Sequence, residues 1–362
     1  MQITLNRINL LDRLSISERG LPGKSHFAPV ECIYMEQQGS NLTLMSNNLE
    51  MAVKTVIPVS NAGEGTTILP KRFVEIVKQL PADEVAITVK DGRAEIKSGK
   101  ANFKLNCMDA ENFPLLDEGY KDNAFIELEG ELLKDMIGKT TFCAANDISK
   151  HVFQGVMISN DGEKSFTCIA SDTYRLSFYE KLQLIPDKPF EVLIPGKMLN
   201  EIGRIIKDED TVKVYISDKD MVFAVNDFVI FARLLDGKYP DLGQAFPQKP
   251  ETVITVDRQA FADTVNRARL LTERQSETIA LSIAEDTLMI GSQSEEGKMS
   301  ESLPVGVEGE LLEQILINGK FVSEGIKAVD GDELSIEFNG PFGAVVMKDE
   351  GFKYLVLPIK KN

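Results

Sequence analysis

A threefold internal repeat constrains the fold of this chain more than any other feature. The segments "ITLNRINLLDRL", "IELEGELLKDMI" and "ITVDRQAFADTV" begin at Ile3, Ile126 and Ile254. Each reads as a short alternating strand followed by an amphipathic run, and the starts lie 123 and 128 residues apart. Within each copy two apolar anchors stand four residues apart, which places them on one helix face. These anchors are Leu10 and Leu14, Leu133 and Ile137, and Phe261 and Val265.

Two further triplets follow the same spacing. The first of these triplets predicts the end of a strand followed by a short helix with a basic residue at its start. The second predicts a hairpin. The stretch "IASDTYRLSF" (169–178) is the second hairpin copy, so its strands are expected to be structural. Hairpin turns are also predicted at Asp91-Gly92 and Asn339-Gly340. The strand–helix copies begin at Ile68, Leu193 and Leu316, and the hairpin copies begin at Asn41, Ser165 and Asp286.

The repeats predict an α+β chain of three similar domains, each with a strand, a helix and further strands twice over. Polar segments with Gly or Pro at 117–123 and 247–251 mark the boundaries. The predicted domains are 1–122, 123–249 and 250–362. Each repeat is larger than a solenoid repeat, so we expect a quasi-symmetric ring or part of a ring.

Composition predicts a cytoplasmic protein without membrane segments. The chain is 43% hydrophobic and 27% charged, as is usual for globular proteins. No apolar run approaches the roughly 18 residues of a membrane span, and the first residues lack the apolar core of a signal peptide. The four cysteines are scattered without a C-x-x-C pair, which favours buried, reduced thiols. They are Cys32, Cys107, Cys143 and Cys168.

Positive charge gathers on the predicted helices of an acidic chain. The net charge of −16 argues against a general nucleic-acid coat. The predicted helices nevertheless hold 16 Lys or Arg against 9 Asp or Glu, and the rest of the chain holds 24 against 47. One explanation is that Lys and Arg favour helices, although Glu favours them equally. The other is a basic surface that faces a phosphate backbone without base readout. The helices are predicted at 6–17, 70–80, 131–145, 196–207, 257–274 and 319–329.

No motif for catalysis, metal or cofactor binding is present. His26 and His151 stand far apart and outside any metal-ligand spacing. The run "GKTT" at 138–141 resembles the end of a P-loop, but Leu133 stands where the first glycine is needed. Asp172 has no adjacent base or second carboxylate. We therefore expect a protein that is not an enzyme and has no catalytic residues, metal or cofactor.

The whole chain resembles the bacterial DNA polymerase III β subunits, the sliding clamps. The strings that carry this resemblance are "NLEM" (48–51), "ASDTYRL" (170–176), "LLDGKYPD" (234–241) and "YLVLPIKK" (354–361). The resemblance implies three DNA-clamp domains per chain and a head-to-tail homodimer closed into a ring. Such a ring encircles duplex DNA at the nucleoid without sequence preference and tethers the replicative polymerase. The alternative is a scaffold of the same fold that binds protein peptides without being loaded on DNA.

The resemblance also implies a groove between the second and third domains, where polymerases, the clamp loader and repair factors dock short peptides. Apolar walls would bury Leu and Phe anchors of the peptide. The terminal "YLVLPI" contains a proline, which suits a sheet edge beside a groove, while simple core burial is the alternative. The implied groove residues are Phe153, Ser171, Thr173, Tyr174, Arg175, Leu176, Pro240, Ala245, Leu355, Leu357, Pro358 and Ile359.

The DNA-facing and dimer-forming residues follow from the same resemblance and from the charge pattern. Lys100 and Lys104 are expected to face the three glutamates of the dimer set across the interface. The expected DNA-binding residues are Arg7, Arg13, Lys24, Lys71, Arg72, Lys78, Lys134, Lys197, Arg204, Lys207, Arg267, Arg269 and Lys320. The expected dimer residues are Lys100, Phe103, Lys104, Leu105, Leu270, Leu271, Glu295, Glu296 and Glu301.

Two residues of the implied groove depart from the family pattern. The family commonly has Thr-Asp-Gly-His-Arg where this chain has "SDTYR", so Thr173 replaces glycine and Tyr174 replaces histidine. A β-branched residue is not expected to adopt the positive φ that glycine allows. The departures predict a changed peptide preference, or a diverged second copy of the clamp.

Overall fold

The computed structural model describes residues 1–162, 165–182, 189–273 and 276–360. Residue contacts divide the chain into two compact units. Unit 1 comprises 1–134 and 201–234, and unit 2 comprises 135–200 and 235–362. The predicted second domain therefore contributes strands to both units.

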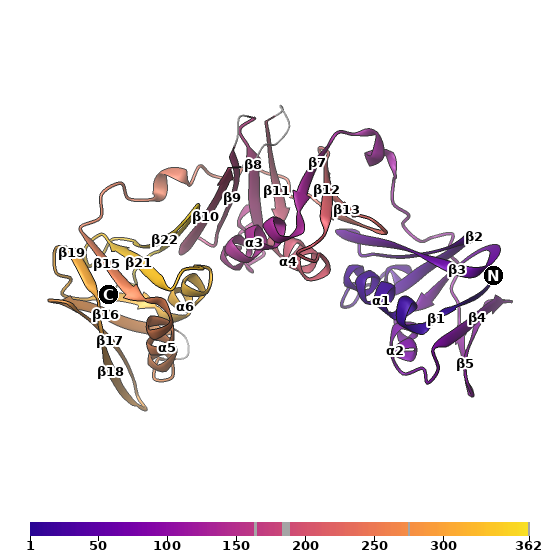
Figure 1. Ribbon diagram of the computed structural model, residues 1–362, viewed down its shortest axis with the longest axis horizontal. Helices are drawn as coiled ribbons and strands as arrows, with labels where there is room; N and C mark the ends of the chain where they lie inside the picture. Colours follow the sequence, from indigo (N-terminus) through magenta and orange to yellow (C-terminus); the bar gives the residue numbers. More distant parts are fainter. Residues whose placement is uncertain (163–164, 183–188, 274–275, 361–362) are drawn as a thin grey trace. The chain divides into compact units, whose positions relative to one another are not determined.

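Unit 1 contains two antiparallel sheets (Figure 1). The larger sheet joins the first predicted domain to the second through the β3–β14 pair, in which Ala52 lies opposite Phe231. The four-stranded sheet has the order β1 (Gln2–Asn6), β4 (Glu84–Lys90), β5 (Arg93–Ser98) and β6 (Ala101–Asn106). The six-stranded sheet has the order β2 (Cys32–Asn47), β3 (Met51–Pro70), β14 (Phe228–Arg233), β13 (Asp220–Val225), β12 (Thr211–Ile216) and β7 (Phe125–Glu129).

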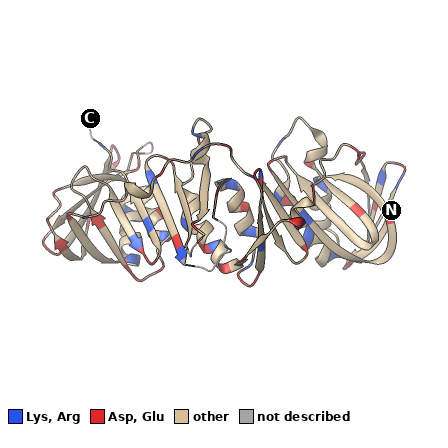
Figure 2. Cartoon of the chain, turned by 90° about the horizontal axis from the view of Figure 1, so that it is seen from above, with Lys and Arg blue, Asp and Glu red and all other residues tan. Residues whose placement is uncertain are grey.

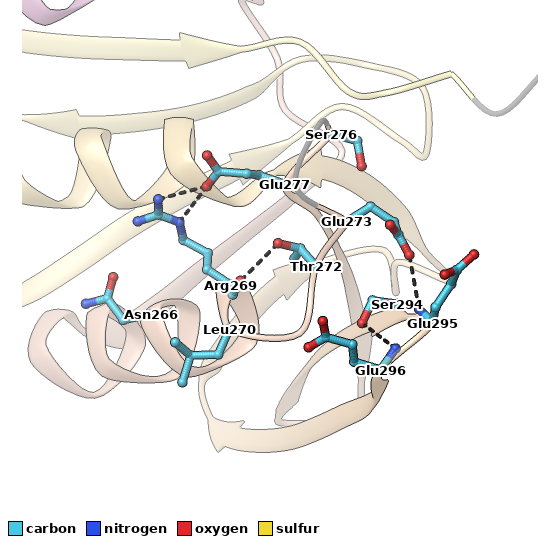
Figure 3. Close-up of a pocket in the computed structure, with 10 residues that line it drawn as sticks. All are labelled: Asn266, Arg269, Leu270, Thr272, Glu273, Ser276, Glu277, Ser294, Glu295 and Glu296. Carbon is cyan, nitrogen blue, oxygen red and sulfur yellow. Dashed lines mark hydrogen bonds and ion pairs between the residues drawn. The ribbon is translucent and has the colours of Figure 1, made fainter.

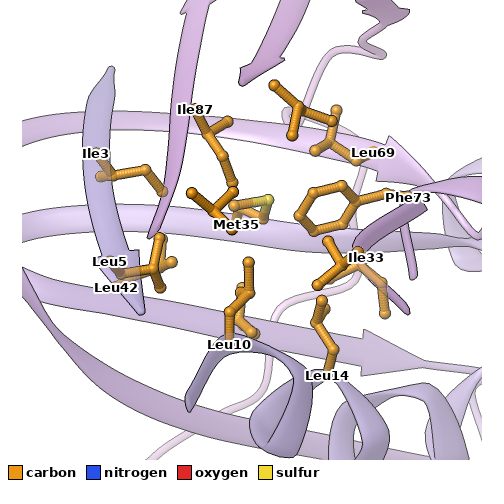
Figure 4. Close-up of a cluster of buried hydrophobic side chains, with 14 of the residues drawn as sticks. Ile3, Leu5, Leu10, Leu14, Ile33, Met35, Leu42, Leu69, Phe73 and Ile87 are labelled. Atoms are coloured by element: carbon orange, nitrogen blue, oxygen red, sulfur yellow. The ribbon is translucent and has the colours of Figure 1, made fainter. Parts of the chain in front are cut away.

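The core of unit 1 forms where helix α1 (Arg7–Ser17) packs on the sheets. The helix begins after Asn6, whose side chain accepts hydrogen bonds from the amides of Ile8 and Asn9. Leu10 and Leu14 point from it into an apolar cluster shared with β1, β2 and β3, and both are fully buried (Figure 4). Burying one such leucine contributes about 1.5–3 kcal/mol. The anchors of the first repeat therefore do what their four-residue spacing predicts.

Unit 2 contains a nine-stranded and a four-stranded antiparallel sheet. Its helices α5 (Arg258–Arg269) and α6 (Gly319–Lys327) lie next to each other (Figure 1). The nine-stranded sheet has the order β11 (Phe190–Pro195), β8 (Gly155–Asn160), β9 (Ser165–Ser171), β10 (Arg175–Leu182), β23 (Phe352–Val356), β22 (Val345–Asp349), β21 (Glu333–Phe338), β15 (Thr252–Asp257) and β19 (Gly306–Gly309). The four-stranded sheet has the order β18 (Gly297–Pro304), β17 (Thr287–Ser294), β16 (Thr278–Ala284) and β20 (Ile315–Asn318).

The three predicted triplets of the repeat are confirmed. Strand–helix pairs β1–α1, β7–α3 and β15–α5 form the first, and the ends of β3, β11 and β20 lead into α2, α4 and α6. The hairpins β2–β3, β9–β10 and β17–β18 form the third. The remaining helices are α2 (Arg72–Lys78), α3 (Gly130–Thr140) and α4 (Gly196–Ile205).

Several predicted helix ends were too late. Helix α3 ends at Thr140 and continues as a 3₁₀ turn, Thr141–Cys143, instead of reaching residue 145. The hydroxyls of Thr140 and Thr141 bond the carbonyls four residues earlier, an arrangement that often accompanies a bend. Helix α5 ends at Arg269, and Arg274 lies outside the described residues.

One of the two predicted hairpin turns is tight. Asp91 and Gly92 have φ values of 50° and 70°, as a two-residue turn of the twisted β4–β5 hairpin requires. The prediction at Asn339-Gly340 was wrong in detail, because β21 and β22 are joined by six residues, 339–344. The Asn339 side chain closes this connection by donating to the carbonyl of Ala344 at 2.8 Å.

The described part of the chain contains no helix that is long and apolar enough to cross a membrane. The four cysteines are free thiols, three of them buried and Cys107 partly buried.

Candidate functional site

The two faces of the β10–β23 strand pair have different surroundings, an apolar cluster on one side and helices on the other. In β10 the side chains of Leu176 and Phe178 lie on one face, in an apolar cluster, while Arg175, Ser177 and Tyr179 contact α3, α6 and the turn after α3 on the other. This two-residue alternation is what a strand imposes.

The apolar face collects most of the predicted groove walls. Leu176 and Leu355 lie opposite each other in the strand register and are buried in the cluster, and Phe153 packs against it. The segment that follows β14 covers part of this face with Tyr239 and Phe246. Ring centroids of Phe153 and Tyr239 are 5.6 Å apart, in an edge-to-face arrangement.

The chain end forms the rim of the same surface. The amide of Leu357 donates to the carbonyl of Tyr174 at 2.9 Å, and the amide of Ile359 donates to the carbonyl of Leu316 at 2.7 Å. The Leu357 side chain is 46% exposed, so it is not simple core. Pro358 is partly buried between them.

The expectation of a sheet edge at the chain end was wrong. Strand β23 lies inside the nine-stranded sheet, paired with β10 on one side and β22 on the other. Pro358 stands two residues beyond the strand, where no ladder hydrogen bond is required of it.

Arg175 is a buried structural residue and not part of the exposed rim. It is 7% exposed, and its guanidinium pairs with Asp172 at 2.9 Å and with Glu324 of α6. It also donates to the carbonyl of Phe142 at 2.6 Å and lies over the ring of Phe321. The arginine therefore ties the β9–β10 turn to α6.

The β9–β10 turn is held by its own side chains. The Asp172 carboxylate accepts from the amides of Tyr174 and Arg175, and the hydroxyl of buried Ser171 accepts from the amide of Thr173. Thr173 has a φ of 80°, so the expectation that a β-branched residue avoids this conformation was wrong. The surrounding hydrogen bonds outweigh the local strain of about 1–3 kcal/mol.

A lysine from a neighbouring segment reaches this turn. The Lys150 ammonium donates to the carbonyl of Asp172 and to the Thr173 hydroxyl, both at 2.8 Å, and lies 4.7 Å from the centre of the Tyr174 ring. Tyr174 is 60% exposed. It stands at the rim as an ordered aromatic surface.

The cysteine beside Arg175 is protonated. Burial raises the pKa of the Cys143 thiol well above its usual range, so no thiolate forms beside Arg175. The described residues contain no cluster of His, Cys, Asp and Glu that could hold a metal ion.

The equivalent face in unit 1 is covered by the chain itself. The segment after β6 packs against this face. The ring of Phe113 stacks on that of Tyr34, with centroids 5.1 Å apart, and the ring of Tyr120 packs edge-to-face against Phe231. Glu118 forms an ion pair with Lys54. When the β3–β14 pair is aligned with the β10–β23 pair, Lys54 occupies the position of Phe178. The open apolar rim is therefore a feature of the β10–β23 junction.

The basic residues expected at DNA sit on helices or loops. Figure 2 shows Lys and Arg in blue interspersed with Asp and Glu in red along the chain. Four of them, Lys24, Lys71, Lys207 and Lys320, are exposed and make no ion pair within the described residues. Seven of the others form the ion pairs Arg13–Asp227, Arg72–Glu75, Lys78–Glu18, Lys134–Asp208, Arg204–Glu201, Arg267–Glu301 and Arg269–Glu277.

The residues expected in the dimer lie at two sheet edges, in the β17–β18 turn and just after helix α5. Strand β6 is an edge of the four-stranded sheet of unit 1 and carries Phe103, Lys104 and Leu105, with Lys100 just before it. Strand β18 is an edge of the four-stranded sheet of unit 2. An exposed edge leaves N–H and C=O groups free to pair with another strand.

A pocket of about 990 Å³ lies between the end of α5 and the β17–β18 turn (Figure 3). Four glutamates and one arginine give it an acidic lining, and Leu270 stands in it 79% exposed. Two of the four glutamates, Glu295 and Glu296, come from the β17–β18 turn, whereas Glu301 is bonded to Arg267 of its own chain. The lining residues are Asn266, Arg269, Leu270, Thr272, Glu273, Ser276, Glu277, Ser294, Glu295 and Glu296.

Comparison with known families accounts for nearly the whole chain. Residues 1–117 match the N-terminal domain of the DNA polymerase III beta subunit, residues 127–241 its central domain and residues 243–360 its C-terminal domain. The chain belongs to the DNA polymerase III beta subunit family. The predicted family and the fold of three clamp domains are thereby confirmed.

Individual members of the beta subunit family are similar along their full length. The Beta sliding clamp of Staphylococcus aureus is 30% identical over 380 aligned positions, which cover 99% of both chains. The crystal structure of the DNA polymerase sliding clamp from Bacillus subtilis has 27% identity, a TM-score of 0.94 and full coverage of both chains. The beta subunit from Streptococcus pyogenes has 25% identity and the same TM-score.

Some residues of the candidate groove escaped sequence reasoning. Phe178 is two residues after Leu176 in β10, so strand alternation could have placed it on the groove face. Tyr239, inside the string "LLDGKYPD", is buried in the cluster, whereas its neighbour Pro240, the predicted groove residue, is exposed. Ala245 is exposed too, while Phe246 beside it is buried in the cluster.

Proposed function

We propose that this protein is a DNA sliding clamp, a beta subunit that encircles duplex DNA and tethers the replicative polymerase. It acts as a head-to-tail homodimer and catalyses no reaction itself. It works at the nucleoid in the cytoplasm. The observation that carries this proposal is the family match along the whole chain, three domains in the family order.

DNA is held by diffuse charge. The exposed basic residues of the helices and of the Lys24 loop attract phosphates without geometric selection, and added salt screens this attraction. The acidic partners of Arg13, Arg204 and Arg267 lower the local positive potential. A closed ring needs only weak attraction, because its topology retains the DNA and tight contacts would slow sliding.

The ring closes by pairing the two edges. The β6 edge of one chain adds to the β18 edge of the other, which extends the sheets and removes both exposed edges. Lys100 and Lys104 then face the acidic pocket that Glu295 and Glu296 line. Each exposed ion pair contributes only about 0–1 kcal/mol, so the apolar residues Phe103 and Leu270 supply more of the affinity.

Partner proteins dock a short peptide on the apolar face of the β10–β23 junction. Leu176, Leu355 and Phe153 form its walls, and Leu357 and Tyr174 its rim. Polymerase, clamp loader and repair factors compete for this surface. The other expected DNA, dimer and groove residues keep their expected roles in this proposal, except that Arg175 supports the groove through its contacts with α6 and Glu301 pairs with Arg267 of its own chain.

Retention on circular DNA tests the clamp. The protein is loaded on a nicked circle by a clamp loader, and its lifetime is measured before and after the circle is cut. Long retention on the circle with rapid loss from the linear form is expected. Equal lifetimes on both forms would contradict a topological link.

The same experiment separates the scaffold alternative. A scaffold that only binds peptides would show no retention on either form, yet would still bind a polymerase-derived peptide. Leu357→Asp is expected to weaken that peptide while leaving the dimer and DNA retention intact, because Leu357 is exposed on the rim. Unchanged peptide affinity in this variant would contradict the proposed position of the peptide groove.

A further inference from the structure

Lys150 connects two walls of the proposed groove. It directly precedes the 3₁₀ turn His151–Gln154, which carries Phe153 into the apolar cluster. This segment is closed on itself, because the amide of Ala145 donates to the carbonyl of Phe153 at 2.7 Å. The position of the Lys150 backbone is thus fixed relative to Phe153.

The other end of Lys150 is fixed to the β9–β10 turn. Its ammonium donates to the Asp172 carbonyl and the Thr173 hydroxyl and covers one side of the Tyr174 ring. No carboxylate of the described residues lies within ion-pair distance of it. Asp172 is engaged by Arg175 instead.

The equivalent turn of unit 1 shows what the lysine adds. Leu49 has a φ of 74°, close to the 80° of Thr173. The Asn48 side chain accepts hydrogen bonds from the amides two and three residues later, and the Asp172 side chain does the same in its turn. Glu50 occupies the place of Tyr174, and its carbonyl accepts a hydrogen bond from the amide of Arg233, as the carbonyl of Tyr174 accepts one from the amide of Leu357. The two turns share their left-handed geometry although the residues at these positions differ, and in unit 2 the Lys150 ammonium also lies over the Tyr174 ring.

A ring held in this way is a selective surface. Tyr174 is 60% exposed with a cation near one face, so a partner can reach only the part that Lys150 leaves uncovered. Aromatic pairs gain energy beyond the area they bury, whereas an aliphatic group of the same shape gains the area alone. A fixed ring also loses less conformational freedom when a partner binds.

We propose that Lys150 is a positioning residue of the groove and that the Tyr174 ring it holds selects partner peptides with an aromatic anchor. This inference rests on the proposed docking of peptides at the β10–β23 junction. It concerns Thr173 and Tyr174, the two places where this chain departs from the pattern of its family.

The test uses two synthetic peptides on the full-length dimer. One carries a Leu and a Phe anchor, and the other carries cyclohexylalanine in place of Phe. The wild-type protein is expected to prefer the Phe peptide by about two- to tenfold in Kd, the range that aromatic pairing gives. Tyr174→Leu should abolish the preference while both peptides still bind.

The lysine variants test the positioning role. Lys150→Gln should reduce the preference and speed dissociation of the Phe peptide, and Lys150→Arg should restore both, because arginine also covers an aromatic face. Lys90→Gln, a change of the same charge at an exposed lysine of β4, should alter neither. Sedimentation of each variant as a dimer verifies folding.

The outcomes separate the inference from the function it rests on. If the Phe preference is absent in wild type, or persists in Tyr174→Leu, the inference is wrong while the groove stands, provided that Leu357→Asp weakens both peptides. If wild type binds neither peptide, the groove and the inference fall together. A preference that Lys150→Gln leaves unchanged would overturn the positioning role.

Discussion

Single residues decide where this fold tolerates strain. Leu49 and Thr173 both occupy the left-handed region at the same place of two repeats, although neither is glycine. In both turns an Asn or Asp side chain satisfies the amides that follow, and this compensates for the strained residue. The repeat thus conserves a turn geometry through two different sequences, "NNLE" and "SDTYR".

Replacing Leu49 with glycine should stabilise unit 1. The Leu49 side chain is 57% exposed, so little apolar area is lost, and relief of the left-handed strain is expected to raise the free energy of unfolding by about 1 kcal/mol. Thr173→Gly should gain less, because it also loses the hydrogen bond from Lys150. Urea midpoints followed by circular dichroism measure both, and a lower midpoint for Leu49→Gly would contradict the strain argument.

Arg175 should matter for stability more than for peptide contact. Arg175→Met removes a buried cation and leaves Asp172 and Glu324 without their partner, which is expected to cost about 3–5 kcal/mol. Glu324→Gln keeps a hydrogen-bond acceptor and should cost less. Thermal unfolding of both variants tests this order. Equal stability of Arg175→Met and wild type would show that the network is not a structural tie.

At the scale of elements, the sequence predicted the repeats well and their surroundings poorly. Leu10, Leu133 and Phe261 mark helices reliably, because the helical period shows in the order of residues. The placement of β23 inside a sheet could not be read in this way, since its partner β10 lies far away in sequence. The same holds for Lys150, whose contact with Tyr174 depends on the tertiary path of its loop.

The segment that covers the unit 1 junction should depend on pH. Hydrogen bonds from Lys121 and Lys54 lower the pKa of Glu118 to about 2. A lowered pKa stabilises the fold above the ordinary carboxyl pKa of 4.5, and this contribution is lost as the pH falls from there toward 2. Because Glu118 is partly exposed, the contribution is at most about 1 kcal/mol.

Glu118→Gln is therefore expected to be less stable than wild type at pH 7 and equal to it near pH 2. Urea unfolding at several pH values measures the difference between the two proteins. Glu111→Gln is the matched control, because Glu111 is exposed in the same segment and its change should leave the pH dependence as it is. A difference for Glu118→Gln that persists unchanged at pH 2 would contradict an electrostatic origin.

At the scale of the whole molecule, an acidic protein must hold DNA with few uncompensated cations. The helices carry most of the expected DNA residues, but at least seven of those thirteen form ion pairs among the described residues. Pairing reduces what each can offer to a phosphate. The lysines without ion pairs in the described residues are thus expected to supply most of the attraction.

A variant in which four lysines are replaced by glutamine should be retained on circular DNA for a shorter time, and its retention should depend less on salt. The replaced residues are Lys24, Lys71, Lys207 and Lys320. The slope of log affinity against log salt is expected to fall by about one for each lysine that contacts a phosphate. The control neutralises Lys90, Lys219, Lys238 and Lys249, which changes the net charge equally at exposed lysines outside the expected DNA set. Because that control keeps the expected contacts, its slope should match wild type. If both variants lowered the slope alike, net charge would govern retention and the basic lining would have no special part in it.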